Sequence, residues 1–149
     1  SPMSRGLGDV YKRQIANRVQ PGKRPRSSMS PTIVLNQADE FVMATGSPGG
    51  NSIIAYTAKT LVGVLDWGLT PQQAVDLPNM VARGDKVRIE RERASAELVD
   101  GLRAMGLTVA ESEGENSGLS VVLKDQNGAL HGGVDPRREG VIERVVFEQ

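Results

Sequence analysis

A glycine-rich turn separates two segments of the chain that differ in hydrophobic periodicity. Residues 41–45, FVMAT, are a short apolar run with β-branched side chains, which predicts a buried strand. Residues 46–50, GSPGG, interrupt that strand, and apolar side chains then recur at helical spacing from residue 51 to about residue 66. The side chains at this spacing are Ile53, Ile54, Thr57, Ala58, Leu61, Val64 and Leu65. The chain therefore combines a strand with an amphipathic helix.

Further elements are predicted next to this strand, turn and helix. Residues 31–35 form a second apolar run, so they are expected to pair with residues 41–45 as a hairpin with both strands largely buried. Thr70 is a suitable N-cap and Pro71 a suitable first residue for a short helix that ends before Pro78.

The remaining strands are expected at residues 86–90, 107–110, 119–124, 129–133 and 141–147. Ser95 and Gly106 suit the beginning and the end of a helix between the first two of these strands. Asn127 and Gly128 favour a tight hairpin turn between the third and the fourth. This order predicts an α+β fold in which antiparallel sheets are flanked by helices.

Composition excludes several kinds of site. The 149 residues include no cysteine and one histidine, which excludes a disulfide scaffold, a cysteine metal site and a multi-histidine metal centre. We expect neither a metal nor another cofactor. No apolar stretch approaches the roughly 18 residues of a membrane-spanning helix, so no membrane span is expected.

Positive charge is concentrated at the start of the chain. The first 28 residues carry seven basic side chains and one acidic side chain, a pattern often found in nucleic-acid-binding tails. However, residues 9–14, DVYKRQ, correspond to a translation of GATGTGTATAAGAGACAG, the end of a transposon adapter used in sequencing libraries. Residues 1–14 are therefore interpreted as a disordered adapter artefact, the alternative being a flexible basic terminus, and no nucleic-acid partner is expected.

The glycine turn is the first candidate site. Gly49 and Gly50 can adopt positive φ, and their N–H groups can point the same way as an anion-binding nest. The helix that follows adds unpaired N–H donors and a favourable dipole. These features suit a phosphate or a developing oxyanion, although Asn51 and Ser52 stand where a phosphate-binding loop has its Lys-Ser/Thr pair. The alternative is a turn that needs glycine only for its geometry.

The second candidate is the serine pair Ser27 and Ser28, which follows Lys23, Arg24 and Arg26. Hydroxyl groups in an extended loop can donate to a carboxylate, and nearby cations would strengthen that interaction. A kinase site and a solvated loop are the alternatives.

Residues 135–138, DPRR, are the third candidate. Asp135 could be a catalytic acid held by arginine, but an internal ion pair that fixes the loop is favoured. His131 has no partner motif and is interpreted as structural, and Trp67 and Phe41 are interpreted as core or packing residues.

Taken together and in order, the motifs resemble one family. The segments concerned are residues 21–32 (PGKRPRSSMSPT), 45–50 (TGSPGG), 66–68 (DWG) and 135–140 (DPRREG). From about Ile15 to the end, the chain resembles the small subunit of γ-glutamyltransferases, also called glutathione hydrolases. The resemblance implies an N-terminal-nucleophile hydrolase, with a four-layer αββα sandwich of which this chain would hold part. It also implies a self-cleaving precursor whose new N-terminal threonine attacks the γ-glutamyl amide of glutathione.

The resemblance also assigns roles to individual residues. Ser27 and Ser28 match the serines that hold the α-carboxylate of the γ-glutamyl group, and Gly49 and Gly50 match the glycines whose N–H groups form the oxyanion hole. The implied acyl-enzyme is released to water or to an amino-acid or dipeptide acceptor. The implied partner is the large subunit of the same precursor, and the implied location of the parent enzyme is periplasmic or extracellular.

One part of the family's pattern is missing. The nucleophile normally stands in a Thr-Thr-His motif ahead of the serine pair, and no such motif occurs in this sequence. Residues 15–149 are therefore expected to be the C-terminal portion of a small subunit, truncated and inactive by itself. The alternatives are a relative that removes acyl side chains from β-lactams and a non-catalytic anion-binding module.

Overall fold

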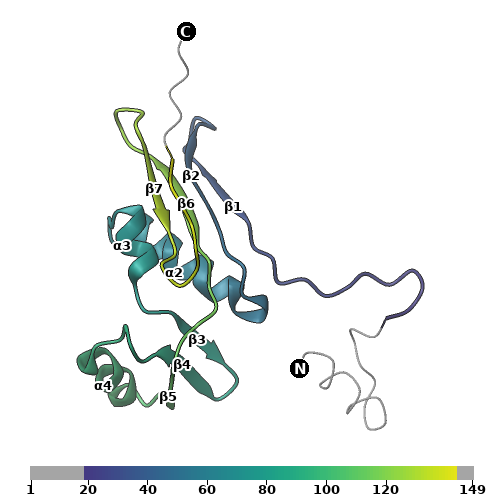
Figure 1. Cartoon of the computed structure of the whole chain (residues 1–149), viewed down its shortest axis with the longest axis vertical. Helices are drawn as coiled ribbons and strands as arrows, with labels where there is room; N and C mark the ends of the chain where they lie inside the picture. Colours follow the sequence, from purple (N-terminus) through teal and green to yellow (C-terminus); the bar gives the residue numbers. More distant parts are fainter. Residues whose placement is uncertain (1–18, 144–149) are drawn as a thin grey trace.

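The structure, a computed structural model, describes residues 19–143 of the chain. It contains a four-stranded and a three-stranded sheet with helices packed against them, so the expected α+β fold is confirmed (Figure 1). Residues 1–14, interpreted as an adapter artefact, lie outside the described residues. So do residues 144–147 of the last expected strand, and residues 141–143 are not in a strand.

The larger sheet has the strand order β1-β2-β6-β7 and is antiparallel throughout. Its strands are β1 (Thr32–Leu35), β2 (Phe41–Gly46), β6 (Ser120–Lys124) and β7 (Leu130–Val134). The hairpin of β6 and β7 turns at Asn127 and Gly128 as predicted, and Gly128 has a φ of 82°.

Strand β1 lies at the edge of this sheet and buries little of its apolar surface. Ile33 is 70% exposed and Leu35 is 51% exposed, whereas Met43 and Thr45 of β2 are buried. The expectation that both hairpin strands are largely buried is therefore wrong for β1. An antiparallel strand that is covered on one face buries only alternate residues.

Helices α2 (Ile53–Leu65) and α3 (Pro71–Asp76) pack on one face of the larger sheet. Thr70 begins α3 as predicted, in a reciprocal capping box with Gln73. The core between these helices and the sheets consists of Met43, Tyr56, Val64, Ala74, Val75, Val81, Leu119 and Val121.

The buried face of α2 is rotated from the predicted one. Its buried residues are Ile53, Tyr56, Thr57, Thr60, Gly63 and Val64. Ile54 and Leu65, both expected on the core face, are 59% and 48% exposed. Since α2 carries apolar side chains on most of its circumference, periodicity alone did not decide which side faces the sheet.

The smaller sheet has the order β3-β4-β5 and lies below the larger one in Figure 1. Strand β3 (Met80–Arg83) was not predicted, β4 (Lys86–Glu90) was, and β5 (Val109–Ser112) begins two residues later than expected. Strands β3 and β4 are antiparallel, whereas β4 and β5 are parallel and are joined through α4 (Ala96–Ala104). Ser95 begins α4 as predicted, since its side chain accepts a hydrogen bond from the Leu98 N–H.

The chain enters and leaves the smaller sheet through two adjoining residues. Asn79 precedes β3 and Ser117 follows β5, and both are fully buried. The Asn79 side-chain amide donates a 2.8 Å hydrogen bond to Ser117 Oγ, and the Asn79 backbone N–H donates to Glu90 Oε2 at 3.2 Å. The two sheets are therefore connected through a buried polar junction.

Candidate functional site

The glycine turn links the end of β2 to the beginning of α2. Gly49 has a φ of 137° and Gly50 a φ of 57°, followed by a single 3₁₀ turn, Gly50–Ser52. A Cβ at position 49 would lie 2.5 Å from Tyr56 Cε2, whereas a Cβ at position 50 would have no neighbour within 4 Å. Position 49 therefore requires glycine because a side chain would clash with Tyr56 and because φ is positive. Position 50 favours glycine because of its positive φ alone.

The backbone N–H groups of this turn are available to a ligand. Within residues 19–143, neither the Gly49 N–H nor the Gly50 N–H has a hydrogen-bond acceptor. No acidic side chain lies in the first turn of α2 or of the 3₁₀ turn before it. Because the positive end of the helix dipole also points here, the turn favours a negatively charged oxygen.

The serine pair lies beside the same turn. Ser28 Oγ donates a 2.7 Å hydrogen bond to the carbonyl oxygen of Gly50, 22 residues further along the chain. Ser27 is exposed, and its Oγ accepts a hydrogen bond from the Met29 N–H at 3.2 Å. The structure thus brings two predicted site segments together, with Ser28 in direct contact with the turn.

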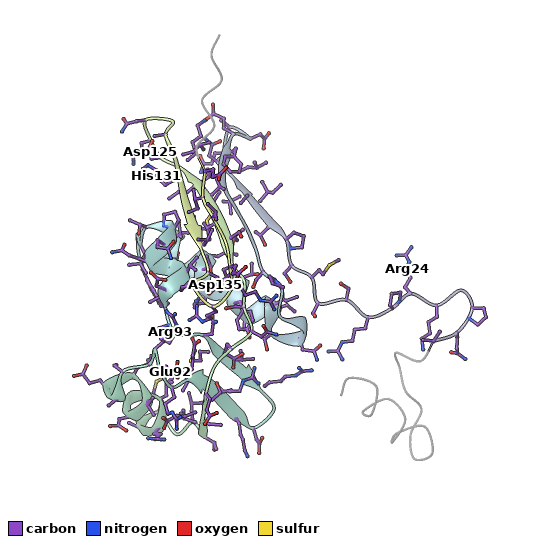
Figure 2. All side chains as sticks on the ribbon, in the orientation of Figure 1. Arg24, Glu92, Arg93, Asp125, His131 and Asp135 are labelled. Carbon is purple, nitrogen blue, oxygen red and sulfur yellow. The ribbon has the colours of Figure 1, made fainter. Side chains whose placement is uncertain are left out.

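The cations near the serine pair lie at different places. Arg24 belongs to the extended segment before β1, which leads away from the sheets in Figure 2. Arg26 lies nearer, because it lines a groove together with Ser28 and Asn51. Arg26 thus lies closer to the candidate site than Arg24 does.

This groove has a volume of about 700 Å³ and runs along the outer side of α2. Its apolar walls include Ile54, Val62, Trp67, Met80 and Leu98. Of the two interpretations of Trp67, core or packing residue, the first is wrong, because Trp67 is 62% exposed and lines this groove. The side of α2 that faces away from the sheet thus continues the site as an apolar surface.

Lys59 also lines the groove. Its ammonium group donates to the carbonyl oxygens of Val75 and Leu77 at 3.2 and 2.9 Å. Burial, together with the charge of Arg137, lowers the pKa of Lys59 to about 8. Lys59 therefore joins α2 to the end of α3.

An ionic cluster centred on the buried side chain of Glu115 lies next to the turn. Glu115, whose side chain is 4% exposed, accepts hydrogen bonds from Tyr56, Arg88 and Ser112. Arg88 also donates to Ser52 Oγ at 3.1 Å, in the residue before α2. Burial opposes ionisation of Glu115, but hydrogen bonds from Arg88 and Tyr56 outweigh it and hold its pKa below the usual value. This cluster was not predicted, because its members are far apart in sequence and form no motif.

In residues 135–138, Asp135 and Arg137 form a second buried ionic cluster with Glu90. The Arg137 side chain is 5% exposed and pairs with Asp135 at 3.0 Å and with both carboxylate oxygens of Glu90. The second oxygen of Asp135 accepts hydrogen bonds from Ser117 Oγ and the Leu119 N–H. The favoured interpretation of this segment, an internal ion pair that fixes the loop, is confirmed. Asp135 lies between the two sheets in Figure 2.

Acidification is expected to destabilise the protein through these carboxyl groups. Burial opposes ionisation of Asp135 and Glu90, but hydrogen bonds from Ser117 to Asp135 and from Arg137 to Glu90 outweigh it, so both pKa values are lowered. A lowered carboxyl pKa stabilises the fold above the unfolded value, about 4, and that contribution is lost as pH falls through the folded value. The free energy of unfolding should therefore fall as the pH drops below about 4.

Urea unfolding followed by circular dichroism at several pH values measures this effect. The variant Asp135→Asn should be less stable at pH 7 and should lose less stability on acidification. An identical acid-induced loss in the variant and in the unaltered chain would contradict the assignment.

His131 and Asp125 form a third, exposed pair. His131 Nε2 lies 2.9 Å from Asp125 Oδ2, at the end of the larger sheet remote from Asp135 (Figure 2). The histidine thus has a partner that the sequence did not reveal. In the part of the chain that the structure describes, no three His, Asp or Glu side chains are grouped to hold a metal ion, and no helix is long and apolar enough to cross a bilayer.

Comparison with known proteins identifies the family of the chain. The family described as Gamma-glutamyltranspeptidase matches residues 2–145. The glutathione hydrolase proenzyme of Escherichia coli (strain K12) is 38% identical over 124 residues, covering 82% of this chain and 21% of the relative. This chain thus spans about a fifth of that relative's length.

Solved structures give the same result. A mutant of Helicobacter pylori gamma-glutamyltranspeptidase has a TM-score of 0.72 at 33% identity, covering 83% of this chain and 68% of that chain. Cephalosporin acylase from Bacillus halodurans is similar in fold, with a TM-score of 0.66 at 24% identity, covering 74% of this chain and 21% of that chain. Since the family match extends over nearly the whole sequence, the chain belongs to the gamma-glutamyltranspeptidase family.

Proposed function

We propose that residues 15–149 are the C-terminal portion of the small subunit of a γ-glutamyltransferase. The intact enzyme transfers the γ-glutamyl group of glutathione and related amides to water or to an amino-acid or dipeptide acceptor. The observation that carries this proposal is the hydrogen bond from Ser28 Oγ to the Gly50 carbonyl. It supports the proposal because Ser28, one of the two proposed carboxylate-binding serines, contacts Gly50, one of the two proposed oxyanion donors.

Each part of the site has a role in this reaction. A threonine hydroxyl attacks the γ-carbonyl carbon, and the carbonyl oxygen becomes an oxyanion that accepts hydrogen bonds from the N–H groups of Gly49 and Gly50. The C–N bond then breaks, the amine leaves with a proton, and an ester to the threonine remains. Ser27 and Ser28 hold the α-carboxylate of the donor, for which Ser28 must redirect its hydroxyl from Gly50.

The rest of the enzyme is part of the proposal. Threonines occur at Thr32, Thr45, Thr57, Thr60, Thr70 and Thr108, and none stands in a Thr-Thr-His motif. The nucleophile and the large subunit are therefore expected from a longer precursor. A periplasmic or extracellular location of the intact enzyme follows from the same resemblance.

A chimera tests the proposal directly. Residues 15–149 replace the aligned segment of the Escherichia coli proenzyme, which supplies the upstream sequence. The chimera should cleave itself and release aniline from a chromogenic γ-glutamyl anilide, whereas this chain alone should release none. A chimera that folds and cleaves itself but has no turnover would contradict the proposal.

Within the chimera, Ser28→Ala should mainly weaken capture of the donor. Loss of a hydrogen bond to a charged group is worth about 1.5–3 kcal/mol, so kcat/KM for the anilide should fall roughly ten- to a hundredfold. The matched control is Ser120→Ala, which removes an exposed hydroxyl on β6 and should change kcat/KM little. Equal kcat/KM in the two variants would remove Ser28 from the site.

A further inference from the structure

We infer that Arg138 is a positioning residue, which holds the segment of residues 115–119 against the glycine turn and thereby fixes the N–H groups of Gly49 and Gly50. The inference rests on the proposed function of those glycines as oxyanion donors. Arg138 itself is exposed and contacts neither the groove nor the serine pair.

The segment of residues 115–119 packs directly on the turn. The Gly118 N–H donates a 3.1 Å hydrogen bond to Ser47 Oγ. A Cβ at Gly118 would lie 2.8 Å from Pro48 Cγ, and a Cβ at Gly49 would lie 3.4 Å from the Asn116 carbonyl oxygen. Ser47, Pro48 and Gly49 therefore pack directly against this segment.

Arg138 holds the middle of the segment from the other side. Its Nη2 donates to the backbone carbonyl of Asn116 at 3.1 Å and to Asn116 Oδ1 at 2.7 Å. Its side chain also covers Gly118, where a Cβ would lie 2.8 Å from Arg138 Cδ. Since Arg138 forms no ion pair with a carboxylate of residues 19–143, the contacts that fix its guanidinium are those with Asn116.

The two ends of the segment are anchored independently. At one end, Glu115 is fixed by Arg88 and by Tyr56, whose ring lies against Gly49. At the other end, Ser117 and Leu119 are fixed by Asp135. The fold is therefore expected to survive without Arg138, whose removal takes away the two hydrogen bonds that hold Asn116 next to Gly49.

The expected result is a loss of rate without a loss of donor binding. A displacement of about 1 Å at a catalytic group can reduce the rate about a hundredfold. In the chimera, Arg138→Ala should therefore lower the acylation rate constant by about ten- to a hundredfold and change the dissociation constant of the donor by less than about twofold. Arg138→Lys, which can reach one Asn116 oxygen at a time, should give an intermediate rate.

The matched control is Arg103→Ala, which removes an exposed arginine that pairs with Asp100 and Glu111 on the smaller sheet side. Acylation is measured as the single-turnover burst of aniline. In the full 149-residue chain, hydrogen exchange of the amides of residues 49–52 should accelerate in Arg138→Ala but not in Arg103→Ala.

Two results overturn the inference. One is an unchanged acylation rate in Arg138→Ala together with loss of acylation in Gly50→Pro. This result would contradict the role of Arg138 but not the proposed function. The other is unchanged exchange at residues 49–52, which shows that the segment does not hold the turn. Normal acylation in Gly50→Pro would instead contradict the proposed function, and the exchange measurement would still report whether Arg138 holds the turn.

Discussion

Replacing Gly50 with proline in the chimera is expected to abolish formation of the γ-glutamyl-enzyme. Proline has no N–H and restricts φ to about −65°, whereas Gly50 has a φ of 57°. The substitution thus removes one of the two proposed oxyanion donors, the Gly50 N–H, and is expected to displace the other, the Gly49 N–H. Loss of a single donor typically lowers kcat about 10²–10³-fold, so acylation should fall at least that far. The burst of aniline from the chromogenic anilide measures it.

Two control variants distinguish the effect of losing the Gly50 N–H from the effect of changing the backbone conformation. Gly50→Ala keeps the N–H and places its Cβ in open space, at a cost of about 1–2 kcal/mol for the left-handed conformation, so the chimera should retain measurable acylation. Gly84→Pro introduces the same conflict at a glycine with a φ of 69° in the turn between β3 and β4, and should leave acylation nearly unchanged. A normal burst in Gly50→Pro would mean that the turn is only structural.

Replacing Arg137 with methionine should cause the largest loss of stability. Arg137 pairs with both Glu90 and Asp135 and also donates to the carbonyls of Val75 and Leu77 at the end of α3. Removing one partner of a buried ion pair typically costs about 3–5 kcal/mol, because the remaining charge stays buried and uncompensated. Urea unfolding of the full chain at pH 7 should show a decrease of this size.

An exposed ion pair provides the control for the Arg137 variant. Arg103→Met removes an arginine that is 49% exposed and pairs with Asp100 and Glu111, so it should cost less than about 1 kcal/mol. If Arg137→Met costs no more than Arg103→Met, the cluster around Arg137 does not hold the two sheets together.

Elements with a local chemical signal were predictable from the sequence. Thr70 with Pro71 fixes the beginning of α3, and Gly128 fixes the turn between β6 and β7, because each acts on its own backbone. The glycine turn was recognisable for the same reason. The resemblance of the chain to a family indicated that the serine pair, Ser27 and Ser28, belongs to the same site. The contact of the turn with Ser28 required the fold.

Features that depend on distant residues were not predictable. Strand β3, with its two exposed end residues, has no clear alternation and forms through its pairing with β4. The cluster of Glu115 joins residues 27 and 59 positions away, and no spacing rule indicates such a contact. Glu90 likewise looked like an ordinary strand residue, although it is one of the two carboxylates that pair with Arg137.

The junction at Asn79 and Ser117 has a consequence for how the chain folds. Strands β2 and β6 are neighbours in the larger sheet, although Met43 and its partner Leu123 are separated by about 80 residues, and closing so long a loop is entropically costly. The smaller sheet forms from contacts that are closer in sequence and brings Asn79 and Ser117 together across 38 residues. Once it has formed, the remaining loop is much shorter, so early assembly of the smaller sheet lowers the kinetic barrier to closing the larger one.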